Sequence, residues 1–116
     1  MPHCIIEYPQ KFESSLQVEK LCRELHLVMI NSGLFQPESI KTRVIPYKYI
    51  SIGKSGEEQP FIHTNVALMS GRTADSKKAL SQAIYNKTKE ICPDLYRISV
   101  EIRDMDKDSY TVNNYL

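Results

Sequence analysis

A chain of 116 residues with 41% hydrophobic and 25% charged residues has the size and composition of one folded domain, and no room for a separate cofactor domain. The formal net charge of +1 argues against nucleic acid as a partner, and no run of about 18 apolar residues could span a membrane. The amino end lacks a basic patch followed by a long apolar stretch, so we expect no secretory signal and a cytoplasmic protein.

The first predicted elements are a strand and a helix. Apolar and polar residues alternate over residues 2–8, and Ile5 makes the second face partly apolar too, as in a covered strand. Ser14 stands three residues before Gln17, as in a capping box, so a helix is expected to begin near Ser15. Apolar residues then recur at helical spacing: Val18, Leu21, Cys22, Leu25, Val28 and Met29.

A second strand follows this helix. Residues 31–33, with the sequence Asn-Ser-Gly, tolerate the left-handed conformation that ends many helices. Alternation over residues 40–45 then predicts a strand. Strand, helix and strand together form a βαβ unit.

The same pattern then starts again. Alternation over residues 60–69 predicts a third strand. Thr73 is expected to cap a helix that begins near Ala74 and ends before Pro93. A clean alternation over residues 98–102 predicts the last strand.

The predicted fold is α+β, a single domain over residues 1–116 built from two similar halves, 2–46 and 60–104. Pro2 and Pro60 head corresponding strands, and a helical crossover makes the two strands of each half parallel. We expect one four-stranded sheet with both helices on one face. The other face also carries apolar residues, so another copy of the chain is expected to cover it.

Two segments lie outside this scheme. Residues 47–59 hold Tyr47, Tyr49 and two isoleucines before a glycine-containing turn, which suits either a hairpin that reaches a neighbouring subunit or a flap on its own subunit. The C-terminal stretch, residues 110–116, allows the same two interpretations.

Pro2 is the strongest candidate for chemistry. Removal of Met1 would leave a secondary amine with an ordinary pKa of about 7.7 to 8.0, and burial would lower that pKa because desolvation disfavours the charged form. The alternative is a proline without any special role, since proline is tolerated at chain starts.

Three cations are candidates for binding a carboxylate. Lys41 and Arg43 are two residues apart on a predicted strand and therefore point to the same face. Arg72 precedes a helix whose free backbone N–H groups and dipole favour an anion. A guanidinium can bind a carboxylate through two parallel hydrogen bonds. The alternative for each cation is a solvated surface charge.

The remaining polar residues are weaker candidates. His3, His26 and His63 have no spacing typical of a metal site or a nucleophile and base pair, so structural roles are expected. Glu7 and Glu101 are interpreted as lone carboxylates on strands. Three cysteines without CxxC spacing argue against disulfides and zinc. We predict neither a metal nor a cofactor.

Five short motifs, taken together, carry a family resemblance. They are the start Met1-Pro2-His3, the strand Ile40-Lys41-Thr42-Arg43-Val44, Phe61 with His63, the turn Gly71-Arg72-Thr73, and the strand Ile98-Ser99-Val100-Glu101-Ile102 with Asn113 and Asn114 behind it. In their order and spacing, over nearly the whole chain, they resemble the tautomerase superfamily and, within it, the 5-carboxymethyl-2-hydroxymuconate isomerase family.

This resemblance implies a reaction, a site and an assembly. Met1 is removed, and the Pro2 amine carries a proton from the 2-hydroxyl side of a conjugated enol to a distant carbon, without a cofactor. Arg72 and Arg43 hold carboxylates of the substrate, 5-carboxymethyl-2-hydroxymuconate, a compound of aromatic (homoprotocatechuate) degradation. The resemblance also implies a homotrimer with sites near subunit boundaries.

Lys41 departs from the family pattern, in which an arginine is expected. A point charge cannot reproduce a bidentate contact, so the substrate's carboxylate pattern stays open. One alternative is a related tautomerase acting on another enol or keto acid. Another is a non-catalytic oligomeric module that binds a small acid, if Met1 is retained.

Overall fold

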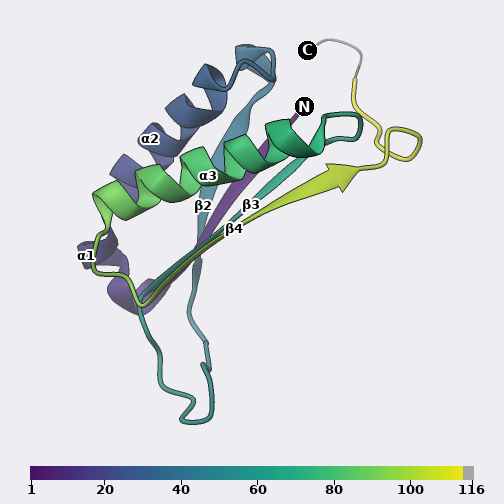
Figure 1. Ribbon diagram of the computed structural model, residues 1–116. Coiled ribbons are helices and arrows are strands. Elements are labelled where there is room, and N and C mark those ends of the chain that lie inside the picture. The colour runs from purple at the N-terminus through teal and green to yellow at the C-terminus, as the bar shows by residue number, and fades with distance from the viewer. Residues whose placement is uncertain (114–116) are drawn as a thin grey trace.

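The predicted sheet and its helices are confirmed by the computed structural model, which describes residues 1–113 (Figure 1). The strands are β1 (His3–Pro9), β2 (Lys41–Tyr47), β3 (Phe61–Met69) and β4 (Arg97–Met105), and the helices are α1 (Glu13–Leu16), α2 (Val18–Asn31) and α3 (Ala74–Ile91). Single 3-10 turns lie at Gln10–Phe12 and Pro37–Ser39. No helix within residues 1–113 has both the length and the apolarity needed to cross a membrane.

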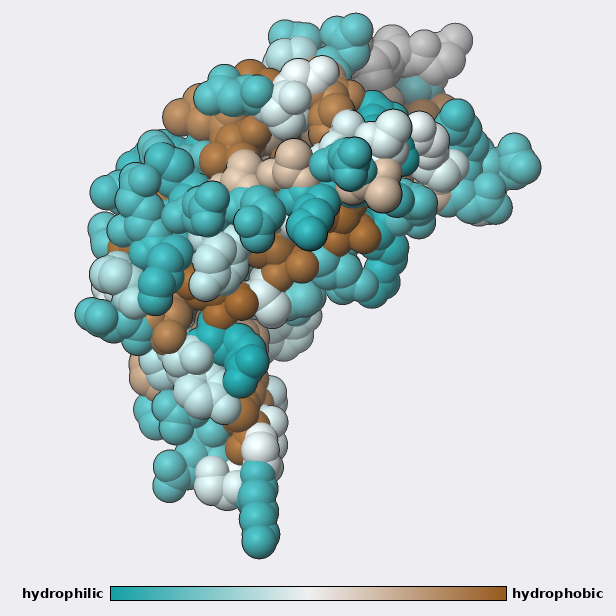
Figure 2. Space-filling model, in the orientation of Figure 1, coloured by the Kyte–Doolittle hydropathy of each residue, from teal (hydrophilic) through white to brown (hydrophobic). Residues whose placement is uncertain are grey.

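The strand order is β2-β1-β3-β4. The outer pairs, β1 with β2 and β3 with β4, are parallel, as the helical crossovers predict, whereas the central pair β1 with β3 is antiparallel. Both long helices pack on one face of this sheet (Figure 1). In Figure 2, which views the molecule in the same orientation, hydrophilic side chains cover most of the surface and apolar patches show between them.

The core lies between the sheet and the two helices. It takes alternate residues of the central strands, including Cys4 and Ile6 of β1 and Ile62 and Val66 of β3, all fully buried. The helices contribute the stripe that the sequence predicts: Leu21, Leu25 and Met29 from α2, and Leu80, Ile84 and Ile91 from α3.

Two threonines are also fully buried in this core. Thr88 of α3 donates its hydroxyl hydrogen to the carbonyl oxygen of Ile84, 2.8 Å away. The hydroxyl oxygen of Thr64 on β3 has no hydrogen-bond partner within residues 1–113.

The predicted start of the first helix is wrong. Gln17 adopts a left-handed backbone conformation with φ of 52°, which separates α1 from α2. Its side-chain amide donates to the carbonyl oxygen of Ile91 at 3.2 Å instead of bonding back to Ser14. A hydrogen bond to a residue 74 positions later in the chain therefore replaces the expected local capping box.

The predicted start of the second helix is confirmed. The Thr73 hydroxyl accepts a hydrogen bond from the Ser76 backbone N–H at 3.1 Å, and α3 begins at Ala74. The helix ends at Ile91, two residues before Pro93.

The two central strands begin in the same way at opposite ends of the sheet. At the start of β1, the carbonyl oxygen of Pro2 accepts a hydrogen bond from the Lys41 N–H at 3.2 Å. At the start of β3, the carbonyl oxygen of Pro60 accepts one from the Tyr96 N–H at 2.9 Å. Pro2 and Pro60 therefore also correspond in their backbone hydrogen bonding. Each proline carbonyl accepts a hydrogen bond from an N–H at or directly before the start of the neighbouring parallel strand, β2 for Pro2 and β4 for Pro60.

The segment between the halves contains no paired strands, so the predicted hairpin is wrong as a β-hairpin. Residues 48–60 form a loop that extends away from the sheet and helices (Figure 1). Gly53 and Gly56 have positive φ values of 62° and 75°, and the Gly56 N–H bonds to the Ile52 carbonyl at 3.0 Å. Tyr49 is 85% exposed on this loop. Contact with a neighbouring subunit stays a prediction.

Candidate active site at the amino end

The amino end of the chain lies at a cavity of about 510 Å³. Met1 lines this cavity, and Pro2 behind it is fully buried. Figure 1 shows the amino end beside the connection that leaves α2 and the one that enters α3. These two connections supply the other walls: Gly33, Leu34, Phe35, Gln36, Ser39 and Arg72.

The wall after α2 is ordered by its own polar groups. Gly33 has φ of 73°, a conformation that glycine adopts without strain, and it turns the chain out of the helix. The buried Ser39 hydroxyl donates to the Gln36 carbonyl at 2.7 Å. The predicted helix end at residues 31–33 is confirmed, and it positions the wall.

Arg72 is held against this wall. Its Nη2 donates to the Leu34 carbonyl oxygen at 2.6 Å, and its guanidinium carbon lies 5.3 Å from the centroid of the Phe35 ring. Arginine has five N–H donors, so others stay available for a ligand. The structure therefore places Arg72 in the wall of the cavity that Met1 also lines, with its guanidinium oriented by two contacts.

The electrostatics of the site disfavour a charged amino terminus. Burial lowers the pKa of the Met1 amine below its ordinary value, and the positive charges of Lys41 and Arg72 lower it further. Any amine at this end of β1 is subject to the same two cations.

Lys41 and Arg43 lie on the sheet face that the helices leave open, as their spacing predicts. Lys41 pairs with His3 in the sheet, and its ammonium donates to the Ser39 carbonyl at 3.1 Å. Arg43 pairs with Ile5 and directs its Nη1 to His3 Nδ1 at 3.1 Å. Neither residue lines the cavity that Arg72 lines. The three cations thus lie in two groups beside the amino end.

Tyr110 is a residue near this site that the sequence analysis did not single out. Its hydroxyl lies 2.9 Å from His3 Nε2, so the first residue of the C-terminal stretch folds back onto its own chain. Asn114 and the rest of residues 114–116 lie outside the described residues. Sequence alone gives no signal for this contact, because 107 residues separate its partners.

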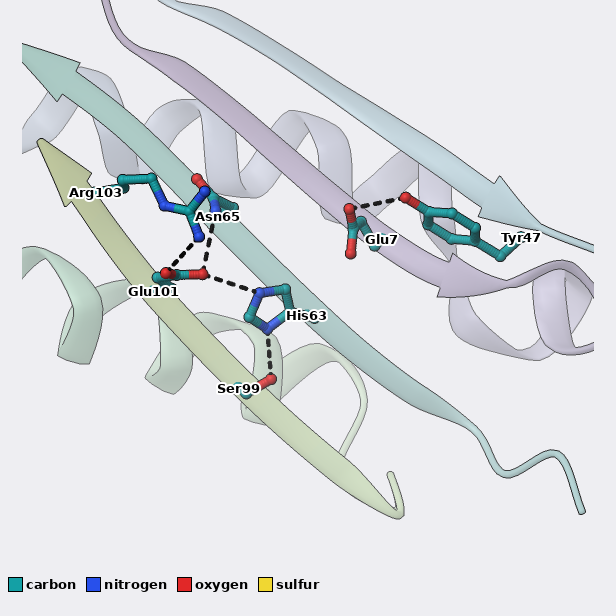
Figure 3. A network of polar contacts seen from close by, with 7 residues as sticks. All are labelled: Glu7, Tyr47, His63, Asn65, Ser99, Glu101 and Arg103. Atoms are coloured by element: carbon teal, nitrogen blue, oxygen red, sulfur yellow. Dashed lines mark hydrogen bonds and ion pairs between the residues drawn. The ribbon is translucent and has the colours of Figure 1, made fainter. Parts of the chain in front are cut away.

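The interpretation of Glu7 and Glu101 as lone carboxylates is wrong. Tyr47 donates to Glu7 at 3.0 Å, while Asn65 and Arg103 donate to Glu101 at 3.2 and 2.8 Å. Figure 3 shows this polar network on the open face of the sheet, with contributions from all four strands. The hydrogen bond from Arg103 lowers the pKa of Glu101 below its ordinary value, so Glu101 is ionised at neutral pH.

His63 joins the same network. Its Nδ1 lies 2.7 Å from the Ser99 hydroxyl, and its Nε2 lies 3.6 Å from the Glu101 carboxylate. Among residues 1–113 there is no group of three or more His, Cys, Asp or Glu side chains placed to hold a metal ion.

A smaller cavity of about 270 Å³ lies at the head of β3. Pro60 lines it together with residues 15–17 and 91–95. Each central strand therefore has a cavity at its head, bounded by the chain that enters one helix and the chain that leaves the other.

Comparison with known proteins supports this description. A family model described as 5-carboxymethyl-2-hydroxymuconate isomerase matches residues 2–116. No curated protein sequence matches at a significant level.

Several solved structures share the fold over almost the full length. A 5-carboxymethyl-2-hydroxymuconate isomerase from Deinococcus radiodurans R1 is 19% identical, with a TM-score of 0.86 over 98% of this chain and 90% of that chain. Pt0534 inactivated by 2-oxo-3-pentynoate is 14% identical, with a TM-score of 0.82 over 98% and 94%. A fused wild-type 4-OT symmetric trimer is 22% identical, with a TM-score of 0.74 over 98% and 94%. The fold is that of the tautomerase superfamily.

Proposed function

Because this chain belongs to the 5-carboxymethyl-2-hydroxymuconate isomerase family, we propose that it ketonises 5-carboxymethyl-2-hydroxymuconate through the amine of Pro2, after Met1 has been removed. The family and its isomerase neighbours support a tautomerase-type isomerase. One observation carries the finer proposal: Pro2 is buried directly behind Met1, and Met1 lines the same cavity as Arg72.

Removal of Met1 changes Pro2 in two ways. It converts an amide nitrogen without basicity into a secondary amine with a lone pair. It also frees the part of the cavity that Met1 lines. Burial and the charges of Lys41 and Arg72 lower the pKa of the Met1 amine, which is one residue from the Pro2 nitrogen. The Pro2 amine is therefore expected to have a pKa lowered by the same two cations and to be a free base at neutral pH.

The proposed reaction moves one proton and needs no cofactor. The Pro2 amine accepts the proton of the 2-hydroxyl group, and the oxygen electrons shift into the conjugated chain, forming the carbonyl. The protonated amine then returns the proton to a distant carbon, so that the product is the unsaturated ketone. The remaining N–H groups of Arg72 bind a carboxylate and stabilise negative charge on the oxygen as it develops.

The second cationic group suits the other end of such a substrate. Lys41 and Arg43 lie on the open face close to His3, outside the cavity that Arg72 lines. A substrate with carboxylates at both ends could contact both groups while its enol lies at Pro2. This arrangement favours a dicarboxylate or tricarboxylate of aromatic catabolism over a simple monoacid.

We also propose that the protein is a homotrimer. The open face carries Ile5, Ile45 and Ala67 beside the polar network, and another copy of the chain would cover them. A related fold occurs in the fused 4-OT symmetric trimer. Sedimentation equilibrium of the purified protein tests this, and a monomer at micromolar concentration would contradict it.

The ultraviolet time course of 5-carboxymethyl-2-hydroxymuconate ketonisation tests the reaction, after mass spectrometry has shown that Met1 is absent. Pro2→Ala should lower kcat by about 100-fold or more, because it replaces a rigid secondary amine with a primary amine whose position the proline ring no longer fixes. Pro9→Ala is the matched control, since Pro9 is a buried proline at the other end of β1. Unchanged turnover in Pro2→Ala would contradict the proposal.

The electrophile 2-oxo-3-pentynoate separates the alternatives, since it inactivates the related Pt0534. A free Pro2 amine would add to its triple bond, with the amine proton moving to the neighbouring carbon and no group leaving. A labelled Pro2 without turnover of the proposed substrate would indicate a tautomerase for another enol or keto acid. An unlabelled Pro2 without turnover would indicate a non-catalytic module that binds a small acid.

A further inference from the structure

Three side chains form a continuous polar chain beside the proposed site. Arg43 Nη1 lies 3.1 Å from His3 Nδ1, and His3 Nε2 lies 2.9 Å from the Tyr110 hydroxyl. The rings of His3 and Tyr110 meet edge to face, with centroids 6.1 Å apart and an angle of 65°. We call this set the Arg43–His3–Tyr110 chain.

The chemistry of arginine fixes the tautomer of His3. A guanidinium is only a donor, so Nδ1 of His3 must accept and cannot carry a hydrogen. A neutral imidazole then carries its hydrogen on Nε2, which donates to the Tyr110 hydroxyl oxygen. His3 is therefore neutral in this arrangement, and each ring nitrogen has a defined role.

The surroundings of His3 keep it neutral. Burial lowers its pKa below the ordinary value, as do the charges of Arg43, Lys41 and the amino terminus. On the other side, β3 places the uncharged Ala67 beside it. Protonation of His3 would turn Nδ1 into a donor facing another donor and would break its contact with Arg43.

We propose that His3 and Tyr110 are positioning residues, which hold the Arg43 guanidinium in one orientation for a substrate carboxylate. This inference rests on the proposed function for its substrate. Arg43 is exposed, and a free arginine loses much rotamer freedom when it binds a ligand. A contact made before binding reduces that loss. Through Tyr110, the segment that follows β4 becomes part of the site.

Tyr110→Phe tests the chain, because it keeps the ring and removes only the hydroxyl. The Michaelis constant for 5-carboxymethyl-2-hydroxymuconate should rise about three- to tenfold with kcat unchanged, since one hydrogen bond that orients the binding group is lost. Tyr96→Phe is the matched control on an exposed tyrosine outside the site. An unchanged KM in Tyr110→Phe would overturn the proposal.

Two substitutions of His3 test the role of Nδ1. His3→Asn retains an acceptor for Arg43, whereas His3→Leu removes it. KM should therefore rise more in His3→Leu than in His3→Asn, with Met1 removal verified by mass in both. Equal KM values in the two variants would overturn the positioning role of His3.

Calorimetric binding of adipate separates failure of this inference from failure of the proposed function. Adipate has two carboxylates and no enol, so its affinity does not depend on turnover. A wild type without ketonisation activity would refute the proposed function alone. Weaker adipate binding in Tyr110→Phe than in Tyr96→Phe would still support the positioning role, and equal binding would refute it.

Discussion

Thr64 and Thr88 allow one substitution to be tested with opposite expected signs. Both side chains are fully buried, but only Thr88 has a hydrogen-bond partner for its hydroxyl within residues 1–113. Valine has nearly the same shape as threonine, with a methyl group in place of the hydroxyl. The substitution therefore changes hydrogen bonding and leaves packing volume almost constant.

The expected magnitudes follow from the cost of a buried polar group. An unsatisfied buried hydroxyl costs about 1 to 3 kcal/mol, so Thr64→Val should raise the free energy of unfolding by about 1 to 2 kcal/mol. Thr88→Val loses a satisfied hydrogen bond of 2.8 Å and should lower it by about 1 kcal/mol. The two variants should therefore differ by roughly 2 to 3 kcal/mol.

Urea denaturation followed by circular dichroism measures both changes as shifts of the midpoint. The dependence on urea should be unchanged, since the surface exposed on unfolding stays the same. All samples need one protomer concentration, because the stability of an oligomer depends on it. A Thr64→Val variant less stable than wild type would refute the reasoning, because it would show that the Thr64 hydroxyl is satisfied.

Three further predictions concern charge and reactivity. Arg72→Lys should lower kcat/KM by roughly tenfold to a hundredfold in the ultraviolet assay, because lysine cannot bind a carboxylate in bidentate fashion; full activity would contradict this. Because the pKa of His3 is lowered in the folded protein, the unfolded chain binds the His3 proton more tightly. The contribution of His3 to the free energy of unfolding should therefore be fully present above about pH 6.5 and be lost as the pH drops through the lower folded-state pKa. Urea midpoints should show this fall in wild type and less of it in His3→Asn. Burial, with Cys22 nearby, raises the pKa of Cys4 to about 12, so iodoacetamide at pH 8 should modify Cys4 only after unfolding; rapid native labelling at that residue would contradict its burial.

Features that depend on a few neighbouring residues could be predicted from the sequence. Alternation located all four strands to within about three residues, because one face of each strand packs toward the helices, fully buried in β1 and β3 and partly buried in β2 and β4. The Thr73 cap was predictable because its partner, Ser76, is three residues away. At Gln17 the same kind of local pattern failed, because a contact with Ile91 outweighed it.

The candidate site was only partly predictable, because its contacts join distant parts of the chain. The common face of Lys41 and Arg43 follows from strand geometry. The contact of Arg72 with the Leu34 carbonyl depends on how two connections meet, which no spacing reveals. The contacts of Glu101 with Asn65 and His63 became visible only with the register between β3 and β4. The roles of Pro2 and the three cations stay predictions for the kinetic tests.

The matching heads of β1 and β3 show how a chain with two similar halves could have a single reactive end. Pro60 has the same kind of backbone hydrogen bond as Pro2 and a cavity of its own, but it follows Gln59, so its nitrogen is an amide. Cutting the backbone between Gln59 and Pro60 would expose a second prolyl amine. Within residues 1–113, the smaller cavity is lined by Asp94 and by no lysine or arginine, so that amine should keep its proton at neutral pH. The asymmetry between the halves would then lie in the open chain end and its cationic neighbours, and not in the shape of the backbone.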